Sequence, residues 1–209
     1  MCFDNFLRSQ FGEPSGVFGA LFVAPALNLA NRRLMRRTVE LLDPGPSDRV
    51  LDVGFGGGYS LMALAGRVTT GKVAGVDYSR QMVDQAAGLL RQHRLASRVH
   101  VQWGDVADLP FRARTFNRAM TVNSIYYWPD IDAGFREIAR VLKPRGRVAV
   151  GFRSPLNLRP FTWSWDNFQV YEPEEVAGIL RRTGFHVVCV EHSDRWRIPD
   201  TVVVVGERD

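Results

Sequence analysis

Apolar residues follow two alternating patterns along most of the chain. Short apolar runs predict strands, and apolar residues that recur every three or four positions, as at Ile131, Phe135 and Ile138, predict helices packed on a sheet. The predicted strands are 49–53, 72–77, 99–103, 116–122, 147–152, 185–191 and 201–206. The predicted helices are 59–65, 79–93, 131–142 and 174–183, with Ser79 as an N-cap. Strands that alternate with helices favour an α/β fold with a mainly parallel, doubly wound sheet.

The two ends of the chain depart from this alternation. No helix is predicted between the last two strands, which favours an antiparallel hairpin at the edge of the sheet. The first 43 residues show helix-like apolar clusters, interrupted at Gly12-Glu13-Pro14 and at Pro25. We therefore expect an N-terminal helical segment over 1–43 and one globular unit over 44–209.

A glycine-dense turn follows the first predicted strand, which carries one acid, Asp52. Glycines in the turn 54–58 accept positive φ angles and place no Cβ over the backbone, so a flat or polar ligand can lie directly on N–H groups. A second acid, Asp77, ends the next strand, 23 residues after Gly54. This is close to the spacing of roughly 20 residues that places a carboxylate on a ribose. A nucleotide-like ligand is the natural occupant.

The glycine turn alone is a weak signal, because Tyr59 replaces the last glycine of a dinucleotide fingerprint. The ordered series is more specific: Asp52, the glycines, Asp77, and then Gly104-Asp105-Val106 after a third apolar run. In this series the chain resembles the class I methyltransferases that use S-adenosylmethionine, of the small-molecule type with domains like methyltransferase domains 11 and 25.

Further sequence motifs typical of this family follow in order. They are Leu109-Pro110-Phe111, Thr115-Phe116-Asn117, Trp128-Pro129-Asp130, residues 140–147 and Gly184-Phe185. The resemblance covers about residues 48 to 190. One departure is Asn117, where the family commonly has aspartate, but this position is at a strand start, far from the expected ligand.

The resemblance implies a Rossmann-like, seven-stranded sheet that binds S-adenosylmethionine and releases S-adenosylhomocysteine. The glycines would hold the methionine portion, Asp52 would orient its amino-acid end, Asp77 would bind the ribose, and Asp105 with Val106 would hold the adenine. The full set expected to bind the cofactor is Asp52, Gly54, Phe55, Gly56, Gly58, Asp77, Tyr78, Met82, Asp105, Val106 and Asn123.

Two aromatic segments at the carboxyl ends of the predicted strands are candidates for binding the methyl acceptor. In 123–130, Tyr126 and Tyr127 can shape a pocket or hydrogen-bond a nucleophile, and Tyr126 is the candidate catalytic residue. Core packing under the next helix is the alternative for Tyr127 and Trp128, and for Trp128 the two interpretations are equally strong. In the long segment 153–171, Phe161 and Trp163 predict an apolar pocket for a small acceptor.

Three further expectations concern the oligomeric state, the need for a catalytic base and the N-terminal segment. The aromatic load of 153–171 could instead form an interface in a homodimer. Holding the acceptor atom in line with the methyl group could supply most of the rate gain, up to ~7–11 kcal/mol, so catalysis does not require a side-chain base. Residues 11–27 would fold over the cofactor as a lid that excludes water, or would only cap the sheet edge.

Composition limits the partners. The net charge of +5 comes from scattered arginines, which favours solvated helix faces over a polynucleotide groove. Cys2 and Cys189 are too far apart for a redox or metal motif, and the four histidines lack metal spacing, so we expect a cytoplasmic protein without a metal. The uncharged stretch 14–31 is too polar and too short to span a membrane.

Three other functions stay open at this point. A dehydrogenase that uses NAD is disfavoured by Tyr59 and by the acid inside the first strand. A protein that binds the cofactor without catalysis, and an RNA methyltransferase, are the other two.

Overall fold

The computed structural model describes residues 32–154, 169–192 and 201–209. The expected lid, 11–27, and the expected substrate residues Phe161 and Trp163 lie outside the described residues. So does all but the last part of the segment 1–43. That last part is helix α4 (Arg32–Leu42), in agreement with the helical pattern of the sequence.

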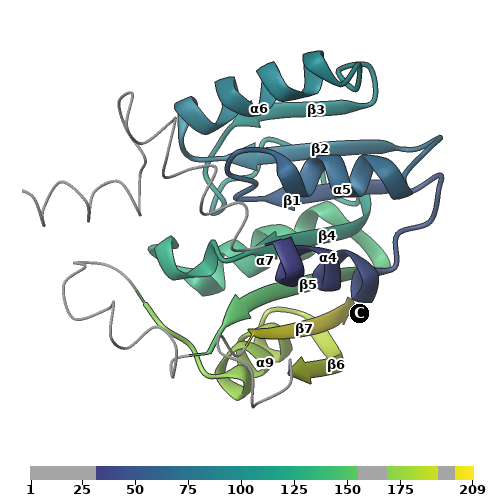
Figure 1. The fold of residues 1–209 in the computed structure, drawn as a ribbon. Helices are drawn as coiled ribbons and strands as arrows, with labels where there is room; N and C mark the ends of the chain where they lie inside the picture. Colours follow the sequence, from purple (N-terminus) through teal and green to yellow (C-terminus); the bar gives the residue numbers. More distant parts are fainter. Residues whose placement is uncertain (1–31, 155–168, 193–200) are drawn as a thin grey trace, which may run out of the picture.

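Seven strands form one sheet in the order β3-β2-β1-β4-β5-β7-β6 (Figure 1). Their bounds are β1 Arg49–Val53, β2 Lys72–Asp77, β3 Val99–Trp103, β4 Phe116–Val122, β5 Leu142–Arg153, β6 Phe185–His192 and β7 Thr201–Arg208. Strands β1 to β5 pair in parallel, and β7 pairs antiparallel with both β5 and β6. The predicted sheet and its antiparallel C-terminal strands are confirmed.

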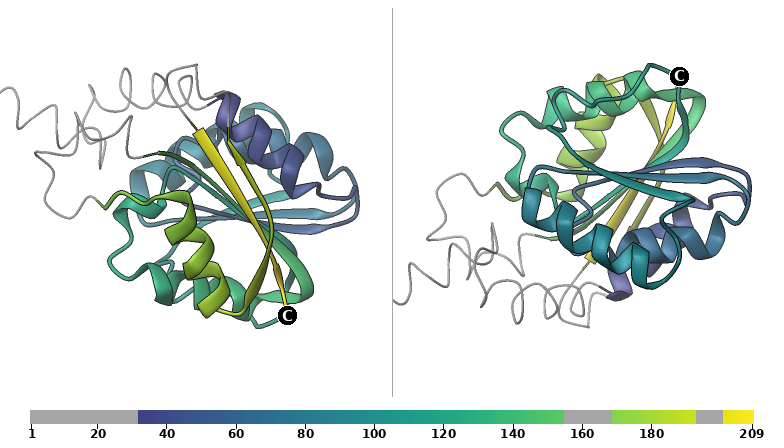
Figure 2. Two further views of the ribbon diagram at one scale, coloured as in Figure 1. Left: turned by 90° about the horizontal axis from the view of Figure 1, so that it is seen from below. Right: turned by 90° about the horizontal axis from the view of Figure 1, so that it is seen from above.

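Helices cover both faces of the sheet. Figure 2 shows α4, α5 (Tyr59–Arg67) and α6 (Arg80–Gln92) on one face, and α7 (Ile131–Val141) and α9 (Pro173–Arg182) on the other. Each face has its own apolar core. Leu61, Leu64 and Leu90 belong to the first core, whereas Phe135, Ile138 and Leu180 belong to the second. The doubly wound architecture therefore follows from helices whose apolar stripes match the two sides of the sheet.

The helices begin where the sequence places hydrogen-bond acceptors. The Ser79 hydroxyl accepts from the Met82 amide at 3.4 Å, as predicted from its place before α6. Asp130 accepts from the Ala133 amide at 2.9 Å at the start of α7. A capping box of Glu172 with Glu175 starts α9. These caps fix the directions in which the loops at the carboxyl ends of the strands enter their helices.

Strand β5 begins earlier than predicted. The helix α7 passes directly into it at Leu142, which pairs with Phe116, whereas the sequence indicated a strand from 147. A register irregularity between Phe116 and Arg118 and a positive φ of 61° at Arg145 accommodate the extra residues. The extension depends on pairing with β4, which a local pattern does not show.

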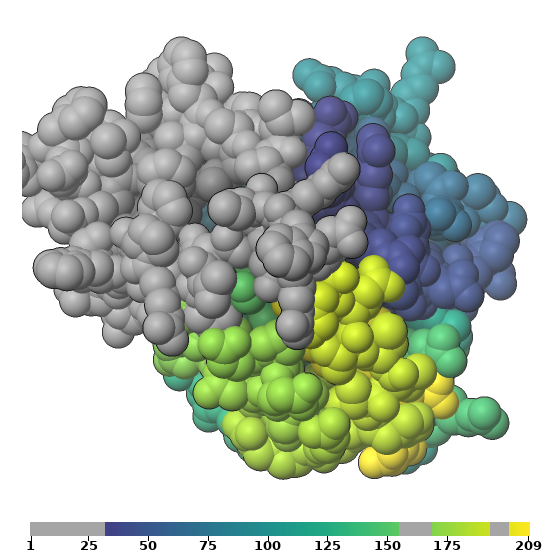
Figure 3. Space-filling view, turned by 60° about the horizontal axis from the view of Figure 1, so that its bottom comes forward, coloured from purple at the N-terminus to yellow at the C-terminus, as the bar shows by residue number. Residues whose placement is uncertain are grey.

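The first described helix is tied to the far edge of the sheet. Arg37 of α4 donates to Glu191 of β6, with an Nε to Oε1 distance of 2.5 Å. On the molecular surface α4 lies beside the C-terminal strands (Figure 3). Because the pair is exposed, we expect it to contribute little to stability.

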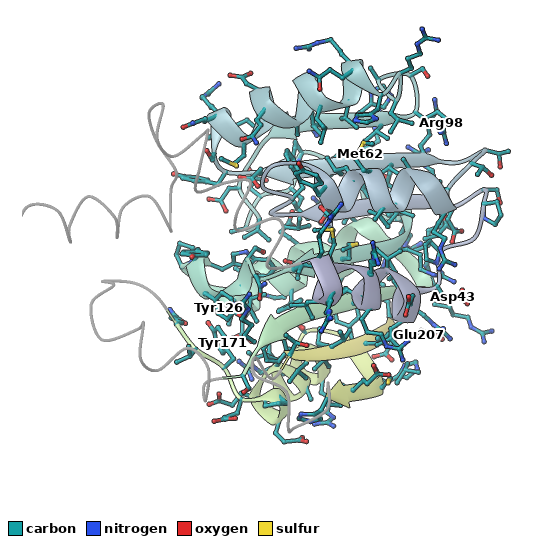
Figure 4. All side chains as sticks on the ribbon, in the orientation of Figure 1. Asp43, Met62, Arg98, Tyr126, Tyr171 and Glu207 are labelled. Carbon is teal, nitrogen blue, oxygen red and sulfur yellow. The ribbon has the colours of Figure 1, made fainter. Side chains whose placement is uncertain are left out.

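Arg98 closes the end of the sheet opposite to the glycine turn. Its Nη1 donates to the Val68 carbonyl at 2.7 Å and lies within 3.4 Å of the Ala65 carbonyl and 3.3 Å of the Thr69 carbonyl, at the C-terminal end of α5. Figure 4 shows Arg98 and Tyr126 at opposite ends of the molecule. A cation at a helix C-terminus satisfies carbonyls that have no partner within the helix.

We predict that Arg98→Met lowers the free energy of unfolding by about 1–2 kcal/mol, because carbonyls at the end of α5 lose a charged donor. Urea unfolding measures this change. The exposed Arg91 of α6 offers a matched control, and Arg91→Met should change the free energy by less than about 0.5 kcal/mol. Equal losses in the two variants would contradict the anchoring role of Arg98.

Candidate cofactor site

The glycine turn connects β1 to α5 through three residues with positive φ. The angles are 72° at Gly54, 54° at Gly56 and 92° at Gly58. The Gly54 amide donates to the Val76 carbonyl at 2.8 Å, which fastens the turn to β2. The left-handed backbone favours glycine at all three positions. The three residues differ, however, in the atoms that surround them.

Two of these glycines are enclosed by protein, and one faces open space. A Cβ on Gly54 would lie 2.5 Å from the Cβ of Ser124, and a Cβ on Gly58 would lie 2.9 Å from that of Ala86. A Cβ on Gly56 would meet no atom of the described residues within 4 Å. Packing therefore accounts for Gly54 and Gly58, whereas the open face of Gly56 is where a ligand can approach the backbone.

Asp77 holds the open part of the turn in place. Its Oδ2 accepts from the Gly56 amide at 2.8 Å, and its Oδ1 accepts from the Ser79 amide at 2.9 Å. Burial raises the pKa of Asp77, and the two amide hydrogen bonds oppose that shift. Since each carboxylate oxygen can accept more than one hydrogen bond, Asp77 can also bind a ribose hydroxyl.

Asp52 is the more deeply buried of the two acids. It is 1% exposed on the inner part of β1, and its Oδ2 has no hydrogen-bond partner among the described residues. Burial raises its pKa to about 7, a hydrogen bond with Ser60 opposes the shift, and the like charge of Asp77 adds to it. The site therefore contains one acid anchored by backbone amides and one that is incompletely satisfied.

The loop after β3 continues the same rim of the sheet. The Gly104 amide donates to the Asp77 carbonyl at 3.2 Å, which links this loop to the turn after β2. Asp105 accepts from the Ala107 amide at 2.9 Å, and Val106 is buried. Asp52, Asp77 and Asp105 thus lie on one continuous rim at the ends of three neighbouring strands, where doubly wound sheets bind ligands.

An exposed aromatic pair flanks this rim, and only one member was anticipated. Tyr78 is 68% exposed, and its carbonyl accepts from the indole N–H of Trp103 at 2.7 Å. Arg80 lies over the Trp103 ring, 4.7 Å from its centre. Tyr78 and Met82 were expected in the site from the sequence, whereas Trp103 was not, although an aromatic residue directly before Gly104-Asp105 is a usable signal. Met82 belongs to the buried face of α6.

Phe55 also belongs to the turn, but its side chain points into the core. A Cβ on Gly75 of β2 would lie 2.6 Å from its ring, so the ring fills the space beside that glycine. Any contact of Phe55 with a cofactor would therefore use its main chain.

The segment after β4 packs directly against the glycine turn. The Ser124 hydroxyl lies 3.3 Å from the Val53 carbonyl and 2.5 Å from the Thr121 hydroxyl. Asn123 has a φ of 52°, and its amide donates to the Gly151 carbonyl at 2.8 Å. Positive φ is uncommon outside glycine, and asparagine is one of the residue types that adopt it more readily. Asn123 was expected in the site from the sequence, whereas Ser124 was not.

Tyr126 is buried rather than open to an acceptor. Its hydroxyl donates to Asn123 Oδ1 at 3.0 Å and accepts from the Arg153 amide at 2.6 Å. Burial raises the pKa of this phenol well above its usual value, so it stays neutral. These contacts favour a positioning role, and a direct role toward an acceptor stays a prediction.

The neighbours of Tyr126 divide between core and surface. Tyr127 is 42% exposed and stays a candidate for acceptor contact. Trp128 packs on Phe135, with ring centres 5.2 Å apart, as the core interpretation expected. Asn117 accepts from the Arg49 amide at 3.0 Å at the start of the strands, so its difference from the family pattern concerns strand pairing and not the ligand.

Comparison with known proteins identifies the family. A family model described as "Methyltransferase domain" matches residues 50–146. O-methyltransferase cnsE of Penicillium expansum is 30% identical, with 76% of this chain and 59% of that protein covered. Methyltransferase GfsG of Streptomyces halstedii is 36% identical, with 70% of this chain and 50% of that protein covered. The chain thus spans about half the length of the relatives it matches, 59% of one and 50% of the other.

A solved structure supports the same conclusion for the fold. The SAM-dependent methyltransferase from Aquifex aeolicus superposes with a TM-score of 0.74 at 21% identity, covering 89% of this chain and 97% of that one. Residues 50–146 carry a methyltransferase domain, and this match, the relatives and the fold together support a class I S-adenosylmethionine-dependent methyltransferase. S-adenosylmethionine is therefore the cofactor that the rim has to fit, and its buried acids and open glycine suit an adenosine with a cationic tail.

Within 32–154, 169–192 and 201–209, no helix is long and apolar enough to cross a membrane. In the same residues no group of three His, Cys, Asp or Glu side chains could hold a metal ion.

We predict that Gly56→Ala weakens S-adenosylhomocysteine binding at least tenfold, because its methyl group enters the open space on the ligand side. Gly184, with a φ of 98° and no atom near an added Cβ, is the matched control. It lies at the start of β6, at the end of the sheet where β5 begins. Both variants should lose about 1–2 kcal/mol of stability through left-handed strain, but Gly184→Ala should bind normally. Calorimetry that finds unchanged affinity for Gly56→Ala would place the ligand elsewhere.

We also predict that Asp52→Asn stabilises the ligand-free protein at pH 8 but not at pH 4. The pKa of Asp52 is raised in the folded protein, so its contribution to stability is complete at low pH and is lost as the pH rises towards about 7. The asparagine variant avoids that loss. Thermal unfolding should show a melting temperature a few degrees higher at pH 8, since each kcal/mol corresponds to about 2–4 °C at this chain length. If the variant were no more stable than the wild type at pH 8, ionisation of Asp52 would not destabilise the folded protein.

Proposed function

We propose that this protein transfers the methyl group of S-adenosylmethionine to a small apolar or aromatic acceptor by in-line displacement. The observation that carries the proposal is the open backbone of Gly56, held by Asp77 and lying on the same rim as the buried Asp52. An oxygen acceptor is favoured, because a relative in the comparison is named an O-methyltransferase.

Different residues of the rim would each bind one part of the cofactor. Asp77 would accept the ribose hydroxyls, Asp105 and Val106 would flank the adenine, and the turn would support the methionine portion. When bound, the cofactor supplies a methyl group on a cationic sulfur that is already a good leaving group. The protein then needs to hold the acceptor atom in line with that methyl group and to keep water out.

The acceptor would be held by the segment that joins β5 to α9. Its described flanks both meet Tyr126: the Arg153 amide donates to the hydroxyl at 2.6 Å, and the Gln169 amide donates to the main-chain carbonyl at 3.0 Å. Arg153 and Gln169, which flank the segment, therefore both lie beside the residue that holds Asn123. We infer that Tyr127 and this segment shape an apolar acceptor pocket.

No side-chain base is part of this proposal. Tyr126 is neutral, and its hydroxyl is already engaged by Asn123 and Arg153. An acidic hydroxyl such as a phenol, or an already nucleophilic atom, suits such a site best.

The remaining expectations belong to the same proposal. Residues 1–43 would act as a lid over the domain 44–209, the location would be cytoplasmic, and a homodimer would be compatible with the aromatic segment. Nucleic acid is not an expected partner.

The first experiment is calorimetry with S-adenosylmethionine, S-adenosylhomocysteine and NAD, followed by a search for methylated products in a panel of phenols and other small metabolites. Cofactor binding with product formation supports the proposal. NAD binding alone would favour an oxidoreductase, and cofactor binding without any product would favour a non-catalytic protein. Strongly salt-dependent RNA affinity would favour an RNA methyltransferase.

We predict that Asp77→Asn weakens S-adenosylhomocysteine binding by about 1.5–3 kcal/mol, or roughly ten- to hundredfold, because a charged acceptor is lost. Asp84, exposed on α6, provides the matched control, and Asp84→Asn should bind as wild type does. Isothermal titration gives both affinities, and circular dichroism verifies that each variant is folded. Wild-type affinity in Asp77→Asn would reject the ribose-binding role.

A further inference from the structure

The end of the sheet where the parallel strands begin carries a row of basic side chains. Arg49 and Lys72, the first residues of β1 and β2, are register partners, and Arg118 of β4 is the register partner of Arg147 of β5. Arg98 comes directly before β3, and Figure 4 shows it at this end of the molecule. Basic residues that are far apart in the sequence thus become neighbours across the sheet.

Helix ends and loops add further arginines at the same end. Because each helix that follows a parallel strand runs back to where the next strand begins, α5 and α6 end here, and the loop before β4 lies here as well. The exposed arginines of these segments are Arg67, Arg91, Arg94, Arg112 and Arg114. We call the surface formed by these arginines together with Arg49 and Lys72 the basic end.

The fold itself uses part of this charge. Arg98 donates to the Val68 carbonyl at the end of α5. Arg67 and Arg91, in the last turns of α5 and α6, complement the negative ends of the helix dipoles. The basic side chains that lie outside helices and form no hydrogen bond or ion pair with a described residue are Arg49, Arg94, Arg112 and Arg114. Their charge can therefore serve a partner.

Acids and bases are separated along the strands. Asp52, Asp77 and Asp105 lie at or just beyond the carboxyl ends of β1, β2 and β3, whereas the basic end lies at the opposite ends of the same strands. This separation produces a field that attracts an acidic partner to the basic end and disfavours it at the rim. A partner bound at the basic end would leave the rim open.

Nucleic acid fits this surface less well than an acidic protein does. Proteins that bind single strands combine a basic groove with aromatic side chains that stack on the bases. The exposed aromatic residues of the described chain lie instead at the carboxyl ends of β1 to β4, and they are Tyr59, Tyr78, Trp103 and Tyr127. Asp43 and Asp209, exposed beside the basic end, would repel a continuous row of phosphates.

An anionic membrane also lacks a matching feature here. Peripheral proteins bind lipid through apolar side chains together with basic ones, and within the described ranges none of the exposed large apolar residues belongs to the basic end. Carboxylates match the surface better, because a guanidinium group binds a carboxylate through two parallel hydrogen bonds. The occasional cations of a protein surface can also pair with Asp43 and Asp209.

We propose that the basic end is a docking surface for an acidic protein, whose carboxylates pair with Arg49, Arg94, Arg112 and Arg114. The partner would hold the domain at the end opposite to the rim and leave the cofactor site open. The proposal goes beyond the proposed function and does not depend on which molecule is methylated. Since exposed ion pairs are screened by salt, the association weakens as the ionic strength rises.

Poly-L-glutamate is a suitable probe, because it presents carboxylates on a polypeptide. Fluorescence anisotropy of the labelled polymer measures its binding to the full chain. We expect an affinity that falls several-fold between roughly 50 and 200 mM salt. Poly-uridylate and vesicles that contain phosphatidylglycerol, compared at equal concentrations of negative charge, should bind more weakly than poly-L-glutamate.

Two double variants separate the effect of the basic end from that of net charge. Arg49→Gln with Arg114→Gln removes two cations from the basic end and should weaken poly-L-glutamate binding roughly five- to tenfold. Arg33→Gln with Arg36→Gln removes the same charge from the exposed side of α4 and should change the affinity less than about twofold. Circular dichroism verifies that both variants are folded.

Three results would overturn the proposal. Equal losses in the two double variants would reduce the binding to an effect of net charge. Absence of poly-L-glutamate binding at low salt would leave the surface without a partner of this chemistry. Tighter binding of poly-uridylate or of the vesicles would assign the basic end to nucleic acid or to a membrane instead.

Discussion

The Asp77 carboxylate is the link on which the rest of the site depends. With one oxygen on the Gly56 amide and the other on the Ser79 amide, it joins the turn after β1 to the start of α6. The carbonyl of the same residue receives the Gly104 amide from the loop after β3. Three loops that are far apart in the sequence are thereby held in one arrangement before any ligand arrives, and preorganisation of this kind lowers the cost of binding.

The two acids of the site illustrate opposite ways of burying a carboxyl group. For Asp77, two main-chain amides oppose the rise in pKa that burial causes, whereas Asp52 lacks a partner for one oxygen among the described residues and has its pKa raised to about 7. The first arrangement contributes to the fold, and the second costs stability when the carboxylate forms without a ligand. An incompletely satisfied buried group is typical of sites where function opposes stability.

The segment after β4 connects the proposed cofactor site to the proposed acceptor pocket. Ser124 fills the space against Gly54, and Tyr126 holds Asn123 together with the end of β5. A substitution in this segment would therefore alter the geometry of both regions. Two parts of a displacement reaction must be aligned to a fraction of an ångström, and a shared rigid support provides that alignment.

The amino-acid sequence by itself determined the type, order and approximate bounds of the elements. Periodicity records locally which face of an element is buried, and strands 49–53, 72–77, 99–103 and 116–122 agree with β1 to β4. The glycines and acids could be assigned to one rim because parallel strands end at the same edge. Ser79 as a cap and the antiparallel C-terminal pair were readable for similarly local reasons.

Tertiary structure alone decided what depends on contacts between distant residues. The insertion of β7 between β5 and β6, the early start of β5, the burial of Tyr126 and the contact of Ser124 with Gly54 each need a partner far along the chain. The same holds for the distinction between Gly56, which faces open space, and the two enclosed glycines. A pattern of residues states that a position is buried or turned, but only the folded chain supplies the neighbour that determines its pKa, its packing and its availability to a ligand.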